Sequence, residues 1–233
     1  MKRVLVTGGS RGIGAATVRA FAAAGYDVTF LFLRSTAAAE ALAFETGATP
    51  LKLDVADGEA VAEALAGMDF DILVNNAGVS SFSLLTDLSD AEWRRTMAVD
   101  LDGAFYCAKA VLPGMISRKW GRIINVSSMW GLVGSSCEAH YSAAKAGLIG
   151  FTKALAKEEG PSGITVNCVA PGVIDTEMNA ALTPETVAEL IDETPAGRLG
   201  TPEEVAKLVL CLASEDASFI TGQVICQSGG LVI

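Results

Sequence analysis

The stretch Thr7-Gly8-Gly9-Ser10-Arg11-Gly12-Ile13-Gly14 decides the fold, because it joins an apolar strand to an Ala-rich helix. Glycines at such a junction let the backbone approach a pyrophosphate closely, and the unpaired N–H groups at the start of the helix favour an anion. Taken alone, the pattern also fits an ordinary tight turn. Its place between the first strand and the first helix of an α/β chain favours the phosphate site.

Short β-branched and aromatic runs alternate with longer Ala-rich stretches along the whole chain, which is typical of βαβ units around a parallel sheet. The expected strands are Arg3 to Thr7, Val28 to Leu33, Pro50 to Asp54, Asp71 to Asn75, Arg122 to Ser127, Thr165 to Ala170 and Gln223 to Cys226. We therefore expect an α/β fold in which residues 1–233 form one Rossmann-like domain. Its doubly wound, mostly parallel sheet of about seven strands lies between two layers of helices, a three-layer αβα arrangement.

Helix starts are marked by capping boxes at Ser89-Asp90-Ala91-Glu92 and Thr201-Pro202-Glu203-Glu204, and by Thr183-Pro184. The stretch of about residues 176–200 has no strand signal. Its Pro195 and Gly197 suggest a mobile lid beside a site.

The composition excludes several classes of protein. The 233 residues are 51% hydrophobic and 19% charged, so the chain is not disordered, yet its apolar runs are too short for a membrane span or a signal peptide. We expect a cytoplasmic protein without membrane contact. The net charge of −10 disfavours nucleic acid. A single histidine, His140, and five widely spaced cysteines predict no metal and no Ser-His-Asp hydrolase.

Three residues in the second half of the chain suggest acid–base chemistry on a carbonyl group. Tyr141 and Lys145 lie at i and i+4 of a helical segment, so both side chains rise from one face. A nearby ammonium is expected to lower the pKa of the phenol. Ser128, at the end of a strand, is placed to donate a second hydrogen bond to a carbonyl oxygen. A buried tyrosine beside a snorkelling lysine is the plainer interpretation of the same spacing.

Two arginines bear on the choice of dinucleotide. Where NAD-binding folds carry an acid at the end of the second strand, this chain has Phe32-Leu33-Arg34-Ser35. Arg34 and Arg11 are suited to a 2′-phosphate, so NADPH (NADP⁺) is the favoured cofactor. Surface arginines without a ligand remain the alternative.

Together these residues resemble the short-chain dehydrogenase/reductase family over essentially the whole chain. The resemblance rests on the glycine turn, Asp54-Val55, Asn75-Asn76-Ala77-Gly78, Ser128, Tyr141 with Lys145, Pro171-Gly172-Val173-Ile174-Asp175-Thr176 and the late Ser228-Gly229-Gly230. It implies an NADPH-dependent reductase that transfers hydride to a ketone while Tyr141 protonates the oxygen. The implied catalytic residues are Ser128, Tyr141, Lys145 and Asp100.

The same resemblance implies a role for each cofactor-binding residue. Asp54 is expected to hydrogen-bond the adenine, Val55 to line its pocket, Asn75 and Gly78 to flank the ribose, and Ile174 and Thr176 to meet the nicotinamide carboxamide. Lys145 is expected to anchor the nicotinamide ribose as well as to acidify Tyr141. The full implied set is Gly8, Ser10, Arg11, Gly12, Ile13, Gly14, Arg34, Asp54, Val55, Asn75, Ala77, Gly78, Tyr141, Lys145, Pro171, Gly172, Ile174 and Thr176.

Asp100 marks a departure from the family pattern, which has an asparagine at this position. The two side chains share a shape but differ by one charge. We expect Asp100 to be tolerated, holding the family's water and pairing with Lys145.

Within the family, the chain is most similar to 3-oxoacyl-acyl-carrier-protein reductases of fatty acid biosynthesis. The shared segments run from Gly121 to Ser128, from Tyr141 to Phe151 and from Gly163 to Asn167. A carrier protein is acidic, so a basic patch is expected, and Arg118, Lys119 and Arg122 are its candidates. Ser162, where such enzymes often carry a basic residue, weakens this interpretation.

Two alternatives remain open. The segments around Ser128-Met129-Trp130-Gly131 and Glu138 also resemble reductases of the 5-aminopentanone modification on elongation factor P. Glu138 would then meet the substrate's amino group, unless it is a solvated loop residue; His140 is given no role. The third candidate is a non-catalytic cofactor sensor or scaffold, although such proteins usually lack the tyrosine or the lysine.

By analogy with the family we expect a homotetramer, joined through the long helices after the fourth and fifth strands and through the C-terminal strand. Ala104, Cys107, Ala108 and Val111 recur at helical spacing and are candidates for that contact or for the subunit core. The apolar C-terminus, Leu231-Val232-Ile233, is the other candidate.

Overall fold

All seven expected strands are present and form one parallel sheet in the computed structural model, which describes residues 1–180 and 182–233. The strand order is β3-β2-β1-β4-β5-β6-β7. The strands are β1 (Arg3–Val6), β2 (Asp27–Phe32), β3 (Thr49–Lys52), β4 (Ile72–Asn75), β5 (Gly121–Val126), β6 (Ile164–Pro171) and β7 (Val224–Gln227). The expected mostly parallel, doubly wound sheet is confirmed.

The third strand ends earlier than its sequence predicts. It pairs with β2 only from Thr49 to Lys52, whereas the expectation ran to Asp54. The reason is local: the Asp54 carboxylate accepts a hydrogen bond from the N–H of Ala56 at 3.1 Å, which turns the chain away from the sheet.

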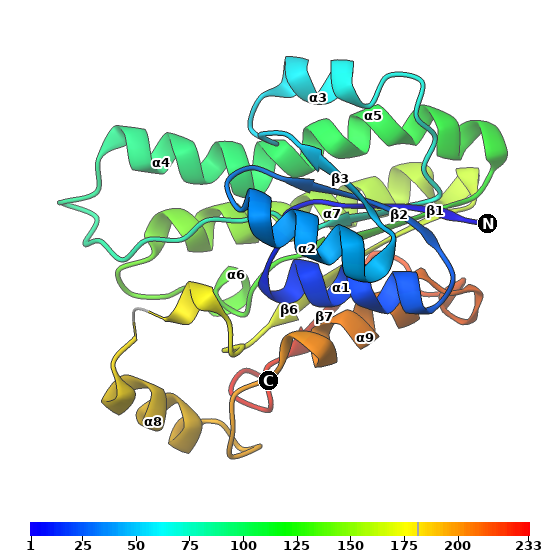
Figure 1. The fold of residues 1–233 in the computed structure, drawn as a ribbon. Helices are drawn as coiled ribbons and strands as arrows, with labels where there is room; N and C mark the ends of the chain where they lie inside the picture. The colour runs from blue at the N-terminus through cyan, green and yellow to red at the C-terminus, as the bar shows by residue number, and fades with distance from the viewer. Residues whose placement is uncertain (181) are drawn as a thin grey trace.

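Helices cover both faces of the sheet (Figure 1). The helices packed on one face are α1 (Gly12–Ala23), α2 (Thr36–Thr46) and α9 (Pro202–Ala213). Those on the other are α3 (Gly58–Ala64), α4 (Asp90–Met97), α5 (Gly103–Arg118) and α7 (Ala139–Glu159). The short α6 (Trp130–Val133) and α8 (Pro184–Glu193) belong to connecting segments. Both predicted capping boxes are present, at Ser89 and Thr201, and Thr183 caps α8.

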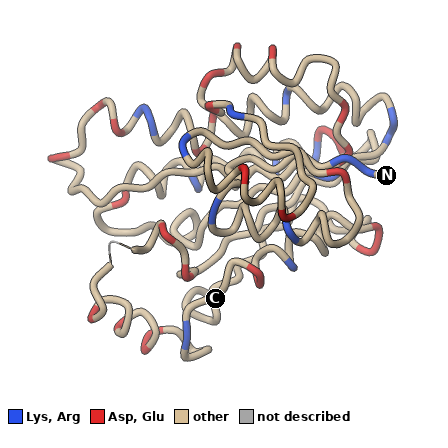
Figure 2. Tube along the Cα trace, in the orientation of Figure 1, with Lys and Arg blue, Asp and Glu red and all other residues tan. Residues whose placement is uncertain are grey.

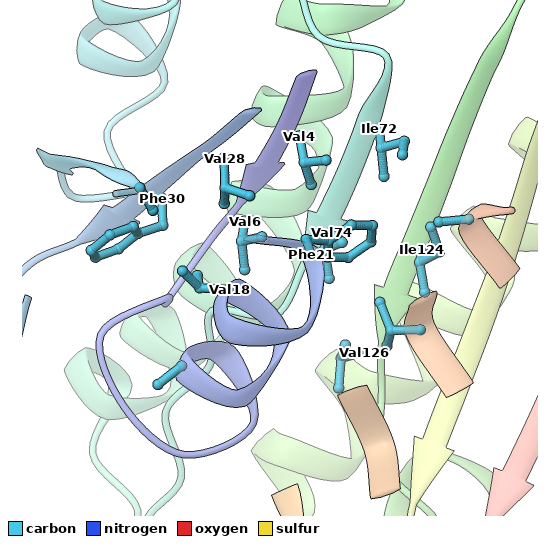
Figure 3. Packing of buried hydrophobic residues seen from close by; sticks show 14 of the residues in the cluster. Val4, Val6, Val18, Phe21, Val28, Phe30, Ile72, Val74, Ile124 and Val126 are labelled. Atoms are coloured by element: carbon cyan, nitrogen blue, oxygen red, sulfur yellow. The ribbon is translucent and has the colours of Figure 1, made fainter. Parts of the chain in front are cut away.

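The core on the α1 side shows why the strands are apolar throughout. Figure 3 shows Val18 and Phe21 of α1 packed against Val6 of β1 and Val74 of β4. All four side chains are fully buried, and each contributes roughly 1.5–3 kcal/mol to folding. A second cluster, which includes Leu73, lies on the opposite face, so a central strand buries both of its sides.

This topology places the site. The strand order reverses between β1 and β4, and a parallel sheet opens a crevice at the carboxyl ends of the strands at that point. Across residues 1–180 and 182–233, no helix has the length and apolar character needed to cross a membrane.

Candidate active site

The glycine turn forms a tight cradle at the start of α1. Thr7 ties it to the neighbouring strand, because its Oγ1 accepts hydrogen bonds from the N–H groups of Asn76 and Ala77, both at 2.9 Å. Gly14 must be a glycine, since a Cβ there would lie 2.1 Å from the carbonyl oxygen of Gly8. Gly12 takes the left-handed φ of +50° that glycine favours. Among the described residues no side chain caps α1, so its first N–H groups face the cavity free for an anion.

A cavity of about 420 Å³ extends from this cradle to the predicted catalytic residues. Both Tyr141 and Lys145 line it. The other predicted residues in its wall are Gly8, Ser10, Arg11, Gly12, Ile13, Gly14, Arg34, Asp54, Val55, Ala77, Gly78 and Thr176. The cavity therefore joins residues from the ends of β1, β2, β3 and β4 with the start of α7, and its wall fits a dinucleotide laid across the sheet edge.

Asn75 does not lie where the family resemblance implied. Its amide faces the protein interior, donating to Oδ1 of Asn125 at 2.9 Å, while Asn76 lines the cavity and donates to the carbonyl oxygens of Thr7 and Gly8. Successive residues of an extended chain point to opposite sides, so Asn75 packs inside the protein and Asn76 faces the cavity. The alternation was the signal that would have selected Asn76.

Three residues of the Pro171 segment also lie away from the cavity wall. Pro171 pairs with Gln227 in the sheet, and Gly172 packs so closely on Ser228 that a Cβ would lie 2.7 Å from its Cα. The side chain of Ile174 is buried in the core. Of this segment's predicted contacts, only Thr176 reaches the cavity.

Two charged cavity residues have partners that the sequence did not suggest. The carboxylate of Asp54 is held by Arg95 of α4, with N–O distances of 2.8 and 3.2 Å. Arg11 pairs with Glu177 at 2.6 Å, across the mouth of the cavity. Arg34, the other arginine predicted to bind the cofactor, also lines the cavity, next to Ser35. Both partners come from distant segments, so no local pattern identifies them.

The first turns of α7 place Tyr141 and Lys145 on one face, as predicted. The Nζ of Lys145 lies 5.5 Å from the centre of the Tyr141 ring and donates to the carbonyl oxygen of Val126 at 3.1 Å. Ser128 follows β5 and lies close enough to the phenol of Tyr141 for its hydroxyl to lower the pKa of that group. The three residues predicted to act on a carbonyl group are thus brought together.

Lys145 lowers the pKa of this phenol, as expected, but burial outweighs its effect. Burial raises the pKa of Tyr141 above its ordinary value of 10.0; Lys145 lowers it, Asp100 raises it, the hydrogen bond from Ser128 lowers it and Glu138 raises it again. Burial acts against the charged phenolate, and two nearby carboxylates oppose the single ammonium. Tyr141 is therefore a protonated donor at neutral pH.

Asp100 pairs with Lys145, as expected. It sits in a π-helical turn, Ala98–Asp102, between α4 and α5. Its Oδ2 lies 3.2 Å from Nζ of Lys145, and its Oδ1 accepts from the N–H of Val79 at 2.8 Å. Such turns often occur at functional sites, and this one directs the carboxylate to α7. The sequence shows no sign of the turn.

Two further α7 neighbours are buried rather than solvated. Glu138 is only 5% exposed and accepts a hydrogen bond from the hydroxyl of Ser80, a residue of the cavity wall, at 2.5 Å. His140 is fully buried, with Nε2 3.1 Å from Oγ of Ser81. Glu138 is therefore not a solvated loop residue.

Of the three residues predicted to form a basic patch for a carrier protein, Arg118 and Lys119 lie at the surface and Arg122 does not. Arg122 is 2% exposed and stacks on Trp120, and Arg118 is held by Asp69 and Asp71. Figure 2 shows the blue residues near the N-terminus and at the adjoining turn, on the side away from α8. The patch lies at the amino end of β5, whereas the site lies at the carboxyl ends.

The expected lid contains the 3₁₀ turn Glu177–Asn179 and α8, which projects from the body on the side opposite the N-terminus (Figure 1). A bridge between Ile174 and Gly200 closes its base. Ala181 of this lid lies outside the described residues. Acidic residues, red in Figure 2, lie along α8. The mobility of this segment stays a prediction.

Comparison with known proteins agrees with this geometry. The sequence model of a family described as enoyl-(acyl carrier protein) reductase matches residues 8–232. The chain is 45% identical to an acetoacetyl-CoA reductase of Shinella zoogloeoides, covering 99% of this chain and 98% of that one. It is 42% identical to a 3-oxoacyl-(acyl-carrier-protein) reductase of Escherichia coli (strain K12), covering 99% and 97%.

A solved structure of a 3-oxoacyl-(acyl-carrier protein) reductase from Brucella melitensis ATCC 23457 is similar throughout. The TM-score is 0.94 and the identity 39%, with 100% of this chain and 91% of that chain covered. The site geometry, the family match and these full-length relatives agree. The chain therefore belongs to the short-chain dehydrogenase/reductase family, as a carbonyl reductase of the branch that includes 3-oxoacyl-(acyl-carrier-protein) and acetoacetyl-CoA reductases.

Proposed function

We propose that this protein reduces the ketone of a 3-oxoacyl thioester with NADPH. The observation that carries the proposal is the convergence of Tyr141 and Lys145 on a cavity that begins at the glycine cradle of α1, with Ser128 beside the phenol. The substrates named for the relatives, acetoacetyl-CoA and 3-oxoacyl-carrier protein, support the thioester.

NADPH, when bound, supplies the hydride for the carbonyl carbon. Tyr141, which holds its proton at neutral pH, gives that proton to the carbonyl oxygen, and Ser128 polarises the same oxygen. Lys145 holds the nicotinamide ribose. Arg11 and Arg34, both in the cavity wall, are suited to a 2′-phosphate, which supports NADPH over NADH.

The test measures initial rates with acetoacetyl-CoA and each dinucleotide, for the wild type and for Tyr141→Phe. We expect NADPH to be preferred, and the variant to lose on the order of 10²–10⁴-fold in kcat while still binding NADPH. Tyr106→Phe, on α5 and outside this cavity, is the matched control. Retained turnover in Tyr141→Phe, or a preference for NADH, contradicts the proposal.

A second substrate is favoured by one observation. Glu138 is buried beside the phenol and bonded to Ser80 in the cavity wall, where its carboxylate suits a substrate amino group. Such a group occurs in the 5-aminopentanone modification of elongation factor P.

Comparing kcat/KM on acetoacetyl-CoA, on the same acyl group carried by acyl carrier protein and on the modified factor separates these substrates. If the modified factor is the substrate, Glu138→Gln should raise KM for it and leave the thioester unaffected. The absence of turnover on every ketone would favour a non-catalytic role.

A further inference from the structure

A buried ion pair lies behind the phenol of Tyr141. Asp100 and Lys145 are 1% and 3% exposed, and their charged atoms are 3.2 Å apart. The N–H of Val79 donates to Oδ1 of the carboxylate, and the ammonium faces Oδ2 as its ion-pair partner. An unpaired charge at this depth is costly, so the ion pair is the form in which each group compensates the other.

The pair lies directly against the cavity. A Cβ on Gly78, a residue of the cavity wall, would lie 2.8 Å from Oδ2 of Asp100 and 3.2 Å from Nζ of Lys145. At Gly78 only backbone lies between the pair and the cavity. A change of charge at residue 100 acts on the reacting groups without moving the surface around them.

The charge around the phenol is negative on balance. The titratable groups that act on Tyr141 or on the pair are Lys145, Asp100, Glu138, His140 and Cys168. The single ammonium is opposed by two carboxylates, one of which pairs with it directly. Burial alone would lower the pKa of Lys145, but Asp100 and Tyr141 raise it, so the ammonium keeps its charge.

We propose that Asp100 is a positioning residue of the reaction: by pairing with Lys145 it offsets the positive charge beside Tyr141, so the phenol holds its proton to a higher pH than an uncharged residue at position 100 allows. The proposal rests on the proposed role of Tyr141 as proton donor. It predicts that reduction stays independent of pH over a wider range than an uncharged residue at position 100 allows.

Asp100→Asn tests the charge with the shape unchanged. The phenol is titrated by ultraviolet difference absorbance in the cofactor-free enzyme, with Tyr141→Phe identifying its signal among the three tyrosines. We expect the midpoint of Tyr141 to fall by about one pH unit or more in Asp100→Asn. The alkaline limb of kcat/KM for NADPH-dependent reduction should move down by the same amount. Asp102→Asn removes an equal charge two residues away and should leave both unchanged.

Equal midpoints in the wild type and Asp100→Asn overturn the proposal, and so does an equal shift in Asp102→Asn. If Asp100→Asn does not fold, Asp100→Ser replaces it as a smaller uncharged variant, and a Tyr141 midpoint in Asp100→Ser equal to that of the wild type likewise overturns the proposal. A wild-type enzyme that reduces no ketone contradicts the proposed function instead. The titration uses no substrate and still measures the effect of Asp100.

Discussion

Arg11 has two candidate partners at the mouth of the cavity. In the structure it pairs with Glu177 of the expected lid, and both side chains are more than half exposed. An exposed ion pair of this kind contributes about 0–1 kcal/mol, so a 2′-phosphate can displace Glu177 at little cost. If NADPH is the cofactor, as proposed, its 2′-phosphate competes with Glu177 for the guanidinium of Arg11.

Glu177→Gln should therefore tighten NADPH binding by up to about fivefold, since up to about 1 kcal/mol of competing interaction is removed. NADH lacks the 2′-phosphate and should gain less. Dissociation constants from nicotinamide fluorescence measure both. Glu185→Gln, also in the lid segment, is the matched control and should change neither; an equal gain for NADPH and NADH would refute the competition.

The start of α9 shows how one element fixes the end of the lid. Thr201 caps the helix through the N–H of Glu204, and the Glu204 carboxylate accepts in return from the N–H of Thr201 at 2.9 Å. Both terminal nitrogens of Arg198 donate hydrogen bonds to the same carboxylate. Chiefly through this arginine, the pKa of Glu204 falls to about 2. A carboxylate with a lowered pKa stabilises the fold above its ordinary pKa of 4.5, and this contribution is lost as the pH falls toward about 2.

Glu204→Gln keeps a capping side chain and removes the charge. We expect a small fall in Tm at pH 7, no more than about 2 °C because the pair is exposed. The difference from the wild type should shrink as the pH falls from 4.5 to about 2, where Glu204 itself becomes protonated. Thermal unfolding followed by circular dichroism measures it, with Glu203→Gln of the same helical turn as control. A difference that stays constant at every pH would rule out the charge as its source.

At the scale of the whole molecule, the structure decides whether four apolar residues of α5 form the tetramer contact or the subunit core. Ala104, Cys107, Ala108 and Val111 are buried within the subunit and belong to its core. The outer side of α5 instead exposes Phe105 and Ile116, 43% and 42% accessible. Because the four predicted residues are buried within the subunit, the proposed homotetramer is expected to use Phe105 and Ile116 on the long helix α5 instead.

Light scattering on a sizing column should give four times the subunit mass of 24.0 kDa. Phe105→Asp should yield a smaller species, because a charge desolvated at an apolar contact costs more than the contact contributes. Phe44→Asp changes an exposed phenylalanine on α2 of the other helix layer and should leave the tetramer intact. A wild-type monomer would contradict the assembly.

Features with a local physical cause were predictable from the sequence. Apolar runs determine all seven strands, and capping residues determine the helix starts. The glycine turn places the phosphate cradle at the start of α1, and the spacing of Tyr141 and Lys145 places the proposed proton donor on α7. Each depends on residues a few positions apart, so the chain specifies it without knowledge of the rest of the fold.

Tertiary structure alone decided how these parts are charged and oriented. It turned Asn76 rather than Asn75 to the cavity, buried Arg122 and Glu138, and set Arg95 on Asp54 and Glu177 on Arg11. It also buried the phenol of Tyr141, which raises the pKa of that group more than Lys145 lowers it, and it joined Asp100 to Lys145. Burial and ion pairing depend on which distant segments meet, and neither is encoded in the spacing of neighbouring residues.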